Sequence, residues 1–183
     1  LSLREAPVVY MDLESAELTK YAANAFLAMK ITFINEMATL CEKVGADVQD
    51  VARGMGLDRR IGPKFLHPGP GYGGSCFPKD TRALARTGQE HAAALKLVEK
   101  TIQINDEVKR RMVDKILDLC GDSVNGKRIA VLGVTFKPDT DDMREAPALT
   151  VVPALVGGGA EVRVADPEGR KEGEALLPGV RWC

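Results

Sequence analysis

The pattern of apolar and polar positions divides the chain into a helical part and an α/β part. From Asp12 to about Val44, apolar residues recur three and four positions apart, which predicts one long amphipathic helix. Asp12 or Ser15 is placed to cap the start of this helix, and Gly45 is placed to end it. Asp47 opens a short second helix, which two glycines close within ten residues. The first part of the chain is therefore expected to be helical.

An irregular segment and a second long helix are expected next. Residues 57–80, LDRRIGPKFLHPGPGYGGSCFPKD, are rich in glycine and proline, which rules out regular structure for most of this segment. A helix resumes near Lys79 and runs to about Arg86. A further helix is expected from about His91 to Cys120, and at ~1.5 Å per residue it would be on the order of 45 Å long. Such a helix is too long for the interior of a small domain, so we expect it to bridge domains or to build a subunit interface.

The hydrophobic period changes after residue 121. The segments GKRIAVLGVTF and AEVRVADPEG are typical of buried parallel strands, and APALTVVPALVGGG between them is typical of a helix. This order opens a βαβ unit and predicts the start of a Rossmann-like, doubly wound parallel domain. One such unit does not close a stable sheet, and the chain starts without methionine and ends on VRWC. We therefore expect a fragment whose α/β domain is truncated.

Composition narrows the classes of function. The chain has 183 residues, of which 45% are hydrophobic and 28% charged, and its net charge is −1 at pH 7. This balance argues against a general affinity for nucleic acid or for anionic membranes. No apolar run approaches the ~18 residues that span a bilayer, and the start does not resemble a signal peptide. The four cysteines form no CxxC pair, so we expect no metal site, and a cytoplasmic protein.

Two apparent nucleotide motifs fail in their context. The segment GDSVNGK fits half of a phosphate loop, but Arg128 stands where a serine or threonine would hold magnesium, and the segment precedes a strand. The first expected strand leads into GVTFKPDTDD, which lacks the GxGxxG fingerprint of dinucleotide-binding domains. No complete dinucleotide site is therefore expected within these residues.

The strongest candidate for chemistry is Cys76. It follows a Gly-Gly-Ser run and precedes the helix expected near Lys79, so the positive end of that helix and the lysine ammonium both favour a thiolate. The glycines allow the backbone to approach a ligand closely and to present N–H groups to it. The alternative is a packed, unreactive thiol. Asp80 is either a base for attack by water or a helix cap.

Two further groups of polar residues are candidates for binding. Lys20 and Asn24 lie four residues apart on one face of the first helix, and a buried asparagine without partners is costly. They form either a solvated stripe or a pair that converges on a pocket. Lys137 and Arg144 lie in FKPDTDDMRE, directly after a strand, where parallel sheets bind ligands. They suit a phosphate or carboxylate, unless this segment is an acidic surface loop with balancing charges.

Three segments together carry a family resemblance. SAELTKYAANAFLAMKITFINE, LDRRIGPKFLHPGPGYGGSCFPKDT and VLGVTFKPDTDDMRE, in this order, resemble the UDP-glucose 6-dehydrogenase family of nucleotide-sugar dehydrogenases. The resemblance implies the tail of an NAD-binding Rossmann domain at residues 1–11 and a helical dimerisation domain with the cysteine loop at 12–120. It implies a truncated UDP-binding α/β domain at 121–183. NAD as cofactor, a UDP-sugar substrate and a homodimer through the central helices are implied as well.

The resemblance also assigns roles. The family oxidises the C6 alcohol of UDP-glucose to a carboxylate in two steps with two NAD. Cys76 resembles the nucleophile, which forms a thiohemiacetal and then a thioester that water hydrolyses. Lys20 resembles the lysine that stabilises the oxyanion, Asn24 the asparagine beside it, and Asp80 the aspartate that activates water. The implied cofactor contacts are Lys79 and Arg144. The implied substrate contacts are Arg60, which reaches the neighbouring subunit's site, and Phe65, Leu66, His67, Pro68, Gly69, Gly73, Phe136 and Lys137.

Other functions remain open on the sequence. A GDP-mannose 6-dehydrogenase would share the cysteine loop and the two-step chemistry, although RIGPKFLHPGPGYGGSCFPKD is more similar to the UDP-glucose branch. A non-catalytic dimerisation module would use only the long helices. A cysteine acyl-transferase or hydrolase would use the thiol without NAD. Because the NAD fingerprint lies outside these 183 residues, the chain alone is expected not to turn over.

Overall fold

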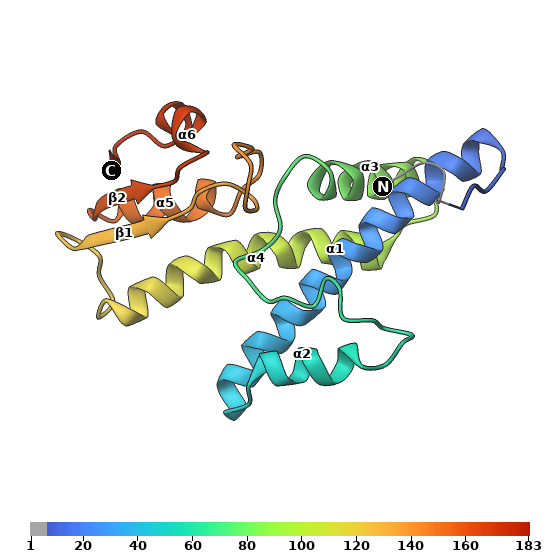
Figure 1. Cartoon of the computed structure of the whole chain (residues 1–183), viewed down its shortest axis with the longest axis horizontal. Coiled ribbons are helices and arrows are strands. Elements are labelled where there is room, and N and C mark those ends of the chain that lie inside the picture. The colour runs from blue at the N-terminus through green and yellow to red at the C-terminus, as the bar shows by residue number, and fades with distance from the viewer. Residues whose placement is uncertain (1–6) are drawn as a thin grey trace.

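The computed structural model describes residues 7–183, so residues 1–6 of the expected N-terminal tail lie outside the described residues. The elements of this part follow in the order α1 (Leu13–Val44), α2 (Val48–Gly56), α3 (Phe77–Glu90), α4 (Lys96–Leu119), β1 (Arg128–Leu132), α5 (Ala148–Gly157), β2 (Glu161–Ala165), α6 (Arg170–Leu176) and β3 (Arg181–Trp182). The helices α1 to α4 form one part, and the sheet with α5 and α6 lies beside the C-terminal half of α4 (Figure 1).

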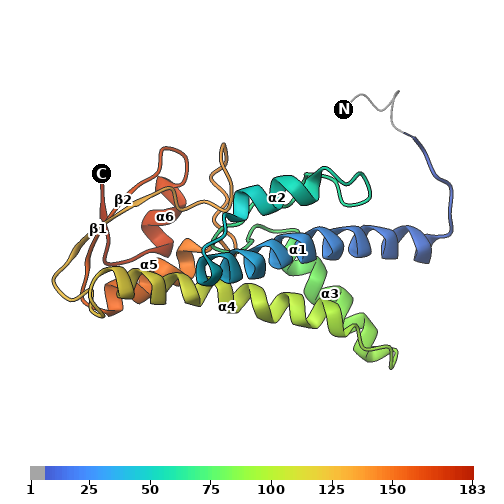
Figure 2. The same cartoon turned by 90° about the horizontal axis from the view of Figure 1, so that it is seen from below.

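Helix α1 has the ends that its sequence predicts. The Asp12 carboxylate accepts the Ser15 N–H at 2.7 Å, which satisfies a free donor of the first turn. Gly45 has a left-handed backbone with φ of 73°, and its N–H donates to the Cys41 carbonyl, which closes the helix. Along its length α1 packs against α2, α3 and α4 (Figure 2). It is the central element around which the helical part is built.

Three helix boundaries differ from those expected. Helix α3 begins at Phe77, because Cys76 already has helical backbone angles and the proline that follows is well suited to a first turn. It also continues past Arg86 to Glu90. The start of α4 at His91 was wrong. Ala92 has φ of +52° and interrupts the helical path, and the Ala93 N–H returns to the Gly88 carbonyl, so α4 begins only at Lys96.

The C-terminal part is the start of a parallel α/β domain, as expected. Its strands pair in the order β1-β2-β3, all parallel, with Ile129 opposite Val162 in the first pair. Helix α5 packs against both β2 and α4, and the end of α4 contributes Ile116 and Leu117 to the apolar core of this part. Helix α4 therefore bridges the two parts. The short α6 and β3 were not predicted.

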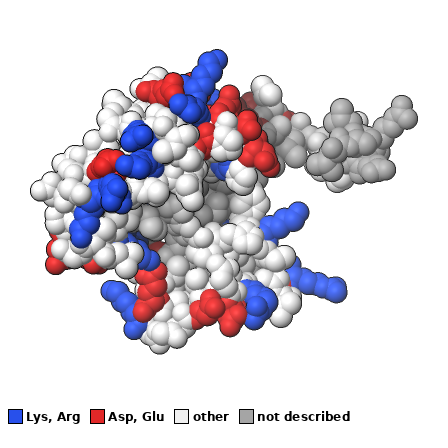
Figure 3. Space-filling model, turned by 60° about the vertical axis from the view of Figure 1, so that its left-hand side comes forward, with Lys and Arg blue, Asp and Glu red and all other residues white. Residues whose placement is uncertain are grey.

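Charged side chains of both signs lie close together on the face seen in Figure 3, around a hollow in which residues other than Lys, Arg, Asp and Glu predominate. In the described part of the chain, no helix combines the length and the apolar character that crossing a membrane would require. Residues 7–183 also bring no three His, Cys, Asp or Glu side chains together as metal ligands.

Candidate active site

Two buried asparagines from different helices hold the cysteine loop in place. The Asn35 Oδ1 of α1 accepts the Gly69 N–H at 2.8 Å. The Asn105 side chain of α4 accepts the Tyr72 N–H at 2.8 Å and donates to the Tyr72 carbonyl at 3.1 Å, so both backbone groups of this residue are satisfied. The glycine-rich loop is therefore fixed at two points, although its sequence predicts only irregular structure.

The same loop contacts the segment that follows β1. The Gly74 N–H donates to the Arg144 carbonyl at 2.7 Å. A Cβ atom at Gly73 would lie 2.4 Å from the Glu145 carbonyl oxygen, and one at Gly74 would lie 2.7 Å from the ring of Phe136. Only glycine allows this approach. Two segments about seventy residues apart, each a candidate from the sequence, therefore form a single site.

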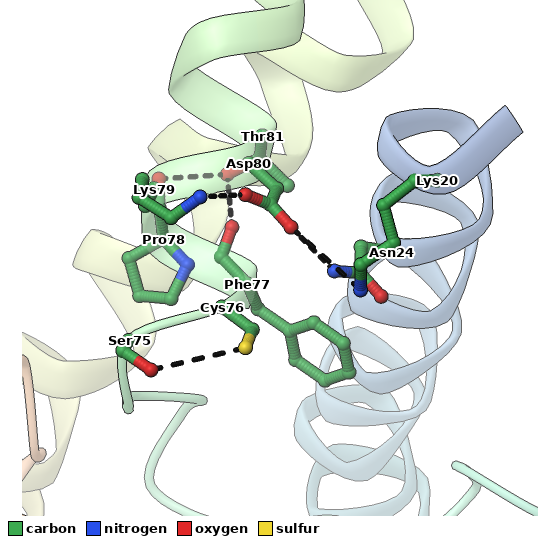
Figure 4. A network of polar contacts seen from close by, with 9 residues as sticks. All are labelled: Lys20, Asn24, Ser75, Cys76, Phe77, Pro78, Lys79, Asp80 and Thr81. Carbon is green, nitrogen blue, oxygen red and sulfur yellow. Dashed lines mark hydrogen bonds and ion pairs between the residues drawn. The ribbon is translucent and has the colours of Figure 1, made fainter. Parts of the chain in front are cut away.

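A polar network connects α1 to the first turn of α3 (Figure 4). Asp80 is only 2% exposed, and its Oδ2 accepts a hydrogen bond from Asn24 Nδ2 at 2.5 Å. Lys79 Nζ pairs with the other carboxylate oxygen, and Lys20 Nζ lies 4.0 Å from Oδ2. The Lys20–Asn24 pair therefore converges on a buried group and is not only a solvated stripe.

The network keeps Asp80 ionised. Burial raises the pKa of this carboxyl, but the hydrogen bonds from Lys79 and Asn24 and the charges of Lys79 and Lys20 outweigh burial and bring the pKa below its ordinary value. The same pairing raises the pKa of Lys79. A buried carboxylate with a lowered pKa is a weak base, so it is better suited to orienting its neighbours than to removing a proton unaided.

The Cys76 thiol lies at the N-terminus of α3, as its position before the helix predicted. Cys76 is the N-cap residue of α3, and its side chain makes no capping hydrogen bond. It is a free, exposed cysteine, and its Sγ lies 3.8 Å from the Ser75 hydroxyl (Figure 4). The thiol is therefore accessible to a ligand, and the alternative of a packed, inert cysteine does not fit its exposure.

A cleft of about 490 Å³ opens beside the loop and is lined from both parts of the chain. Six of the residues expected to contact substrate line it, namely Phe65, His67, Gly69, Gly73, Phe136 and Lys137. Three others lie elsewhere. Leu66 is buried in the core of the helical part, Pro68 lines a neighbouring cavity, and Arg60 lies in an apolar groove along α1.

The two residues expected to contact cofactor lie on either side of this loop. The Lys79 ammonium is exposed and lies 6.0 Å from the centre of the Tyr21 ring. The exposed Arg144 guanidinium makes a two-point contact with Asp142, which raises the pKa of the arginine. The Gly74 N–H donates to the Arg144 carbonyl, and Lys79 is three residues after Cys76, so both cations belong to segments that adjoin the cysteine loop.

Asn35 is a candidate that the sequence did not bring out. It lines the cleft and is buried, and its Nδ2 has no hydrogen-bond partner within the described residues, although its Oδ1 is satisfied. An unpaired buried amide costs ~1–3 kcal/mol, so this donor favours a ligand atom in the cleft. The signal was the same as for Asn24, a weak helix former in the middle of an apolar helix.

Comparisons with known proteins agree with this architecture. The family model for the central domain of the UDP-glucose/GDP-mannose dehydrogenase family matches residues 14–107. The model for the UDP binding domain of the same family matches residues 130–183. The chain therefore belongs to the UDP-glucose/GDP-mannose dehydrogenase family, as its three motif segments predicted.

Individual relatives give the same result. The chain is 59% identical over 180 residues to UDP-glucose 6-dehydrogenase of Rhizobium meliloti (strain 1021), covering 98% of this chain and 41% of the relative. It is 54% identical over 172 residues to UDP-glucose 6-dehydrogenase TuaD of Bacillus subtilis (strain 168), with coverages of 94% and 37%. The structure of a UDP-glucose dehydrogenase from the hyperthermophilic archaeon Pyrobaculum islandicum is similar with a TM-score of 0.94 and 38% identity, covering 98% and 41%. The chain thus spans about two fifths of the length of the curated relatives it matches.

Proposed function

We propose that the whole protein oxidises UDP-glucose to UDP-glucuronate in two NAD-dependent steps. The observation that carries this proposal is the 59% identity to a UDP-glucose 6-dehydrogenase over 98% of the chain. The arrangement of Cys76, Asp80, Asn24 and Lys20 beside a cleft that also contains Lys137 supports it. We assign residues 12–120 to the dimerisation domain and 121–183 to the UDP-binding domain. Four free cysteines suit a reducing compartment, so we place the protein in the cytoplasm.

The proposed chemistry uses the thiol as a covalent hold on the intermediate. The Cys76 thiolate adds to the C6 aldehyde carbon, which forms a C–S bond and leaves negative charge on the former carbonyl oxygen. The Lys20 ammonium, with Asn24 beside it, stabilises that charge. Once the adduct has been oxidised to a thioester, water attacks the acyl carbon, the C–S bond breaks, and the thiolate is restored. Asp80 orients Asn24 and is the group that we assign to the water step.

The residues near the thiol fit an anionic dinucleotide. NAD, when bound, supplies the acceptor for the hydride that leaves C6 in each oxidation. Lys79 and Arg144 are exposed cations on segments that adjoin the cysteine loop, and a guanidinium in particular matches a pyrophosphate in shape and charge. We propose that these two residues contact the cofactor.

The decisive experiment removes the nucleophile. Cys76→Ala in the whole protein should lower UDP-glucuronate formation from UDP-glucose by about a thousandfold or more. Cys183→Ala is the matched control, because Cys183 is also free and exposed and plays no role in the proposed site. We expect the chain by itself to bind UDP-glucose without turning over. UDP-glucuronate formation that survives in the Cys76→Ala protein would overturn the covalent mechanism.

The nucleotide can be identified separately. Calorimetric titration of the chain with UDP-glucose and GDP-mannose should give binding of the first and much weaker binding of the second. The identities of 59% and 54% to two UDP-glucose 6-dehydrogenases support this order of affinity. The reverse order would assign the protein to the GDP-mannose branch, and catalysis without NAD would favour an acyl-transferase or hydrolase.

We propose that two copies associate through the central helices. Large apolar side chains on one side of α1, including Leu18, Phe26 and Phe33, are exposed, and contiguous exposed apolar surface is typical of an interface. Phe26 and Phe33 line the same groove as Arg60, so a second copy seated there would bring this arginine to the interface. Sedimentation should give a dimer. A strictly monomeric chain would contradict the proposal. If the chain is a dimer but the whole protein has no dehydrogenase activity, a purely structural module is favoured.

A further inference from the structure

Asp166 connects two strand ends at the edge of the sheet that faces the cleft. It follows β2 directly and is buried, at 8% exposure. Its Oδ2 accepts the N–H groups of Val134 and Thr135, which follow β1, at 2.7 and 3.4 Å. Its Oδ1 accepts those of Glu168 and Gly169, beyond β2, at 3.0 and 2.7 Å. Both carboxylate oxygens are therefore used by backbone groups from two separate loops.

No cation offsets the charge of this buried carboxylate in the described residues. Salt bridges within this part of the chain do not include Asp166. Burial raises the pKa of Asp166, but the four backbone hydrogen bonds outweigh burial and lower the pKa, so the group is ionised. Because its oxygens are occupied and it does not line the cleft, Asp166 has no direct contact to offer a substrate.

The loop that Asp166 holds leads straight into the cleft. The Thr135 hydroxyl donates to the Lys137 carbonyl at 2.9 Å. This bond connects Thr135, whose N–H is held by Asp166, to the residue two positions further along the loop. Phe136 and Lys137 both line the cleft, and the Phe136 ring packs so closely on Gly74 that no side chain fits there. A shift of the backbone after β1 would therefore displace one wall of the cleft relative to the cysteine loop.

We propose that Asp166 is a positioning residue, which sets Phe136 and Lys137 for binding of the UDP-sugar by fixing the backbone that follows β1. This inference rests on the proposed function. The role of Asp166 is not limited to a local turn, because its Oδ2 contacts join residues more than thirty positions apart. Asp166→Asn replaces one acceptor oxygen by a donor, so it removes the contacts on one side of the carboxylate and puts two donors face to face.

The test measures how UDP-glucose protects Cys76 against alkylation by iodoacetamide, followed by mass spectrometry of the peptide that contains Cys76. In the Asp166→Asn chain, the UDP-glucose concentration that gives half protection should rise by about 10- to 100-fold. The rate of alkylation without ligand should stay unchanged, since the thiol itself is not altered. Asp122→Asn is the charge-matched control, because Asp122 lies in an exposed bend and does not line the cleft. In the whole protein, KM for UDP-glucose should rise while kcat changes little.

The outcomes separate the two proposals. If UDP-glucose protects Cys76 neither in the unmodified chain nor in the whole protein, the proposed function fails; if it protects only the whole protein, the same comparison is made there. If it protects the unmodified chain and a folded Asp166→Asn chain equally, the positioning role is refuted. Should Asp166→Asn fail to fold, Thr135→Val decides, because it removes only the hydroxyl bond to the Lys137 carbonyl and keeps the methyl group that packs on Gly169. Half protection at the same concentration as in the unmodified chain would then overturn the inference.

Discussion

Gly73 is the point at which the cysteine loop meets the segment that follows β1, and Gly73→Ala tests that contact directly. The added Cβ would lie 2.4 Å from the Glu145 carbonyl oxygen, 2.8 Å from its carbonyl carbon and 3.0 Å from the Ala146 Cα. All three are backbone atoms, so no flexible side chain can move aside. Overpacking of this kind costs ~1–3 kcal/mol, whereas alanine gains about 0.4–1 kcal/mol by restricting the unfolded chain.

Gly69→Ala is the control that measures only the effect of alanine on the unfolded chain. Gly69 lies in the same loop, its backbone is outside the left-handed region, and no atom lies within 4 Å of its added Cβ. The free energy of unfolding in urea should therefore be lower for Gly73→Ala than for Gly69→Ala by about 1–3 kcal/mol.

Hydrogen exchange of the Gly74 amide shows whether the destabilisation by Gly73→Ala acts at this contact. The Gly74 N–H donates to the Arg144 carbonyl at 2.7 Å, so its hydrogen exchange reports whether the loop stays docked. Exchange of this amide should be about 5- to 150-fold faster in Gly73→Ala, which corresponds to the same ~1–3 kcal/mol. If the two alanine variants unfold within about 0.5 kcal/mol of each other and the Gly74 amide keeps its protection, the close contact does not exist in solution.

Three further predictions concern buried polar groups near the loop. Because the pKa of Asp80 is lowered in the folded state, its contribution to stability is present above its ordinary pKa of 3.8 and is lost as the pH falls through the lower folded value. The free energy of unfolding, measured by urea titration at a series of acid pH values, should therefore fall less steeply with falling pH in Asp80→Asn than in the unmodified chain. An equal dependence on pH would contradict the ion pairing with Lys79. Asn105→Ala leaves both backbone groups of Tyr72 unpaired and should cost ~2–5 kcal/mol in urea unfolding, while a cost below about 1 kcal/mol would mean that water replaces the side chain. Burial raises the pKa of Tyr72 to about 12, so its near-ultraviolet absorbance should titrate there, and stability should fall as the pH rises from 10 towards 12; a transition near pH 10 would argue against its burial.

The sequence predicts elements best where their signals are local. Both ends of α1 were predicted because an aspartate at the N-cap and a glycine with positive φ act on the adjacent turn. The start of α4 was wrong because the apolar period continues through residues 91–95, while the break depends on the left-handed Ala92 and on the bond from Ala93 back to Gly88. Strand β3 has only two residues, too few for an alternating pattern to be visible.

The candidate site divides in the same way. Spacing alone placed Cys76 before a helix and Asp80 in its first turn, because these relations lie within a few residues. The hydrogen bond between Asn24 and Asp80 joins positions 56 residues apart, and the sequence presents its two ends only as separate candidates. Asn35 and Asn105 were missed because a polar residue in an amphipathic helix does not indicate which loop it will hold.

Glu145 shows how the two walls of the cleft are fixed relative to each other. Its φ of +54° lies in the left-handed region, which costs a residue with a side chain of this kind ~1–2 kcal/mol and persists only where the surroundings determine it. Three contacts do so here. Arg82 of α3 binds its carboxylate through both terminal nitrogens, the buried Lys109 of α4 donates to its carbonyl at 3.1 Å, and Gly73 packs on that same carbonyl. Since these contacts come from α3, α4 and the cysteine loop, the strained backbone of one residue ties the α/β part to all three. The position of Phe136 and Lys137 relative to Cys76 therefore follows from the junction between the two parts, and not from either part alone.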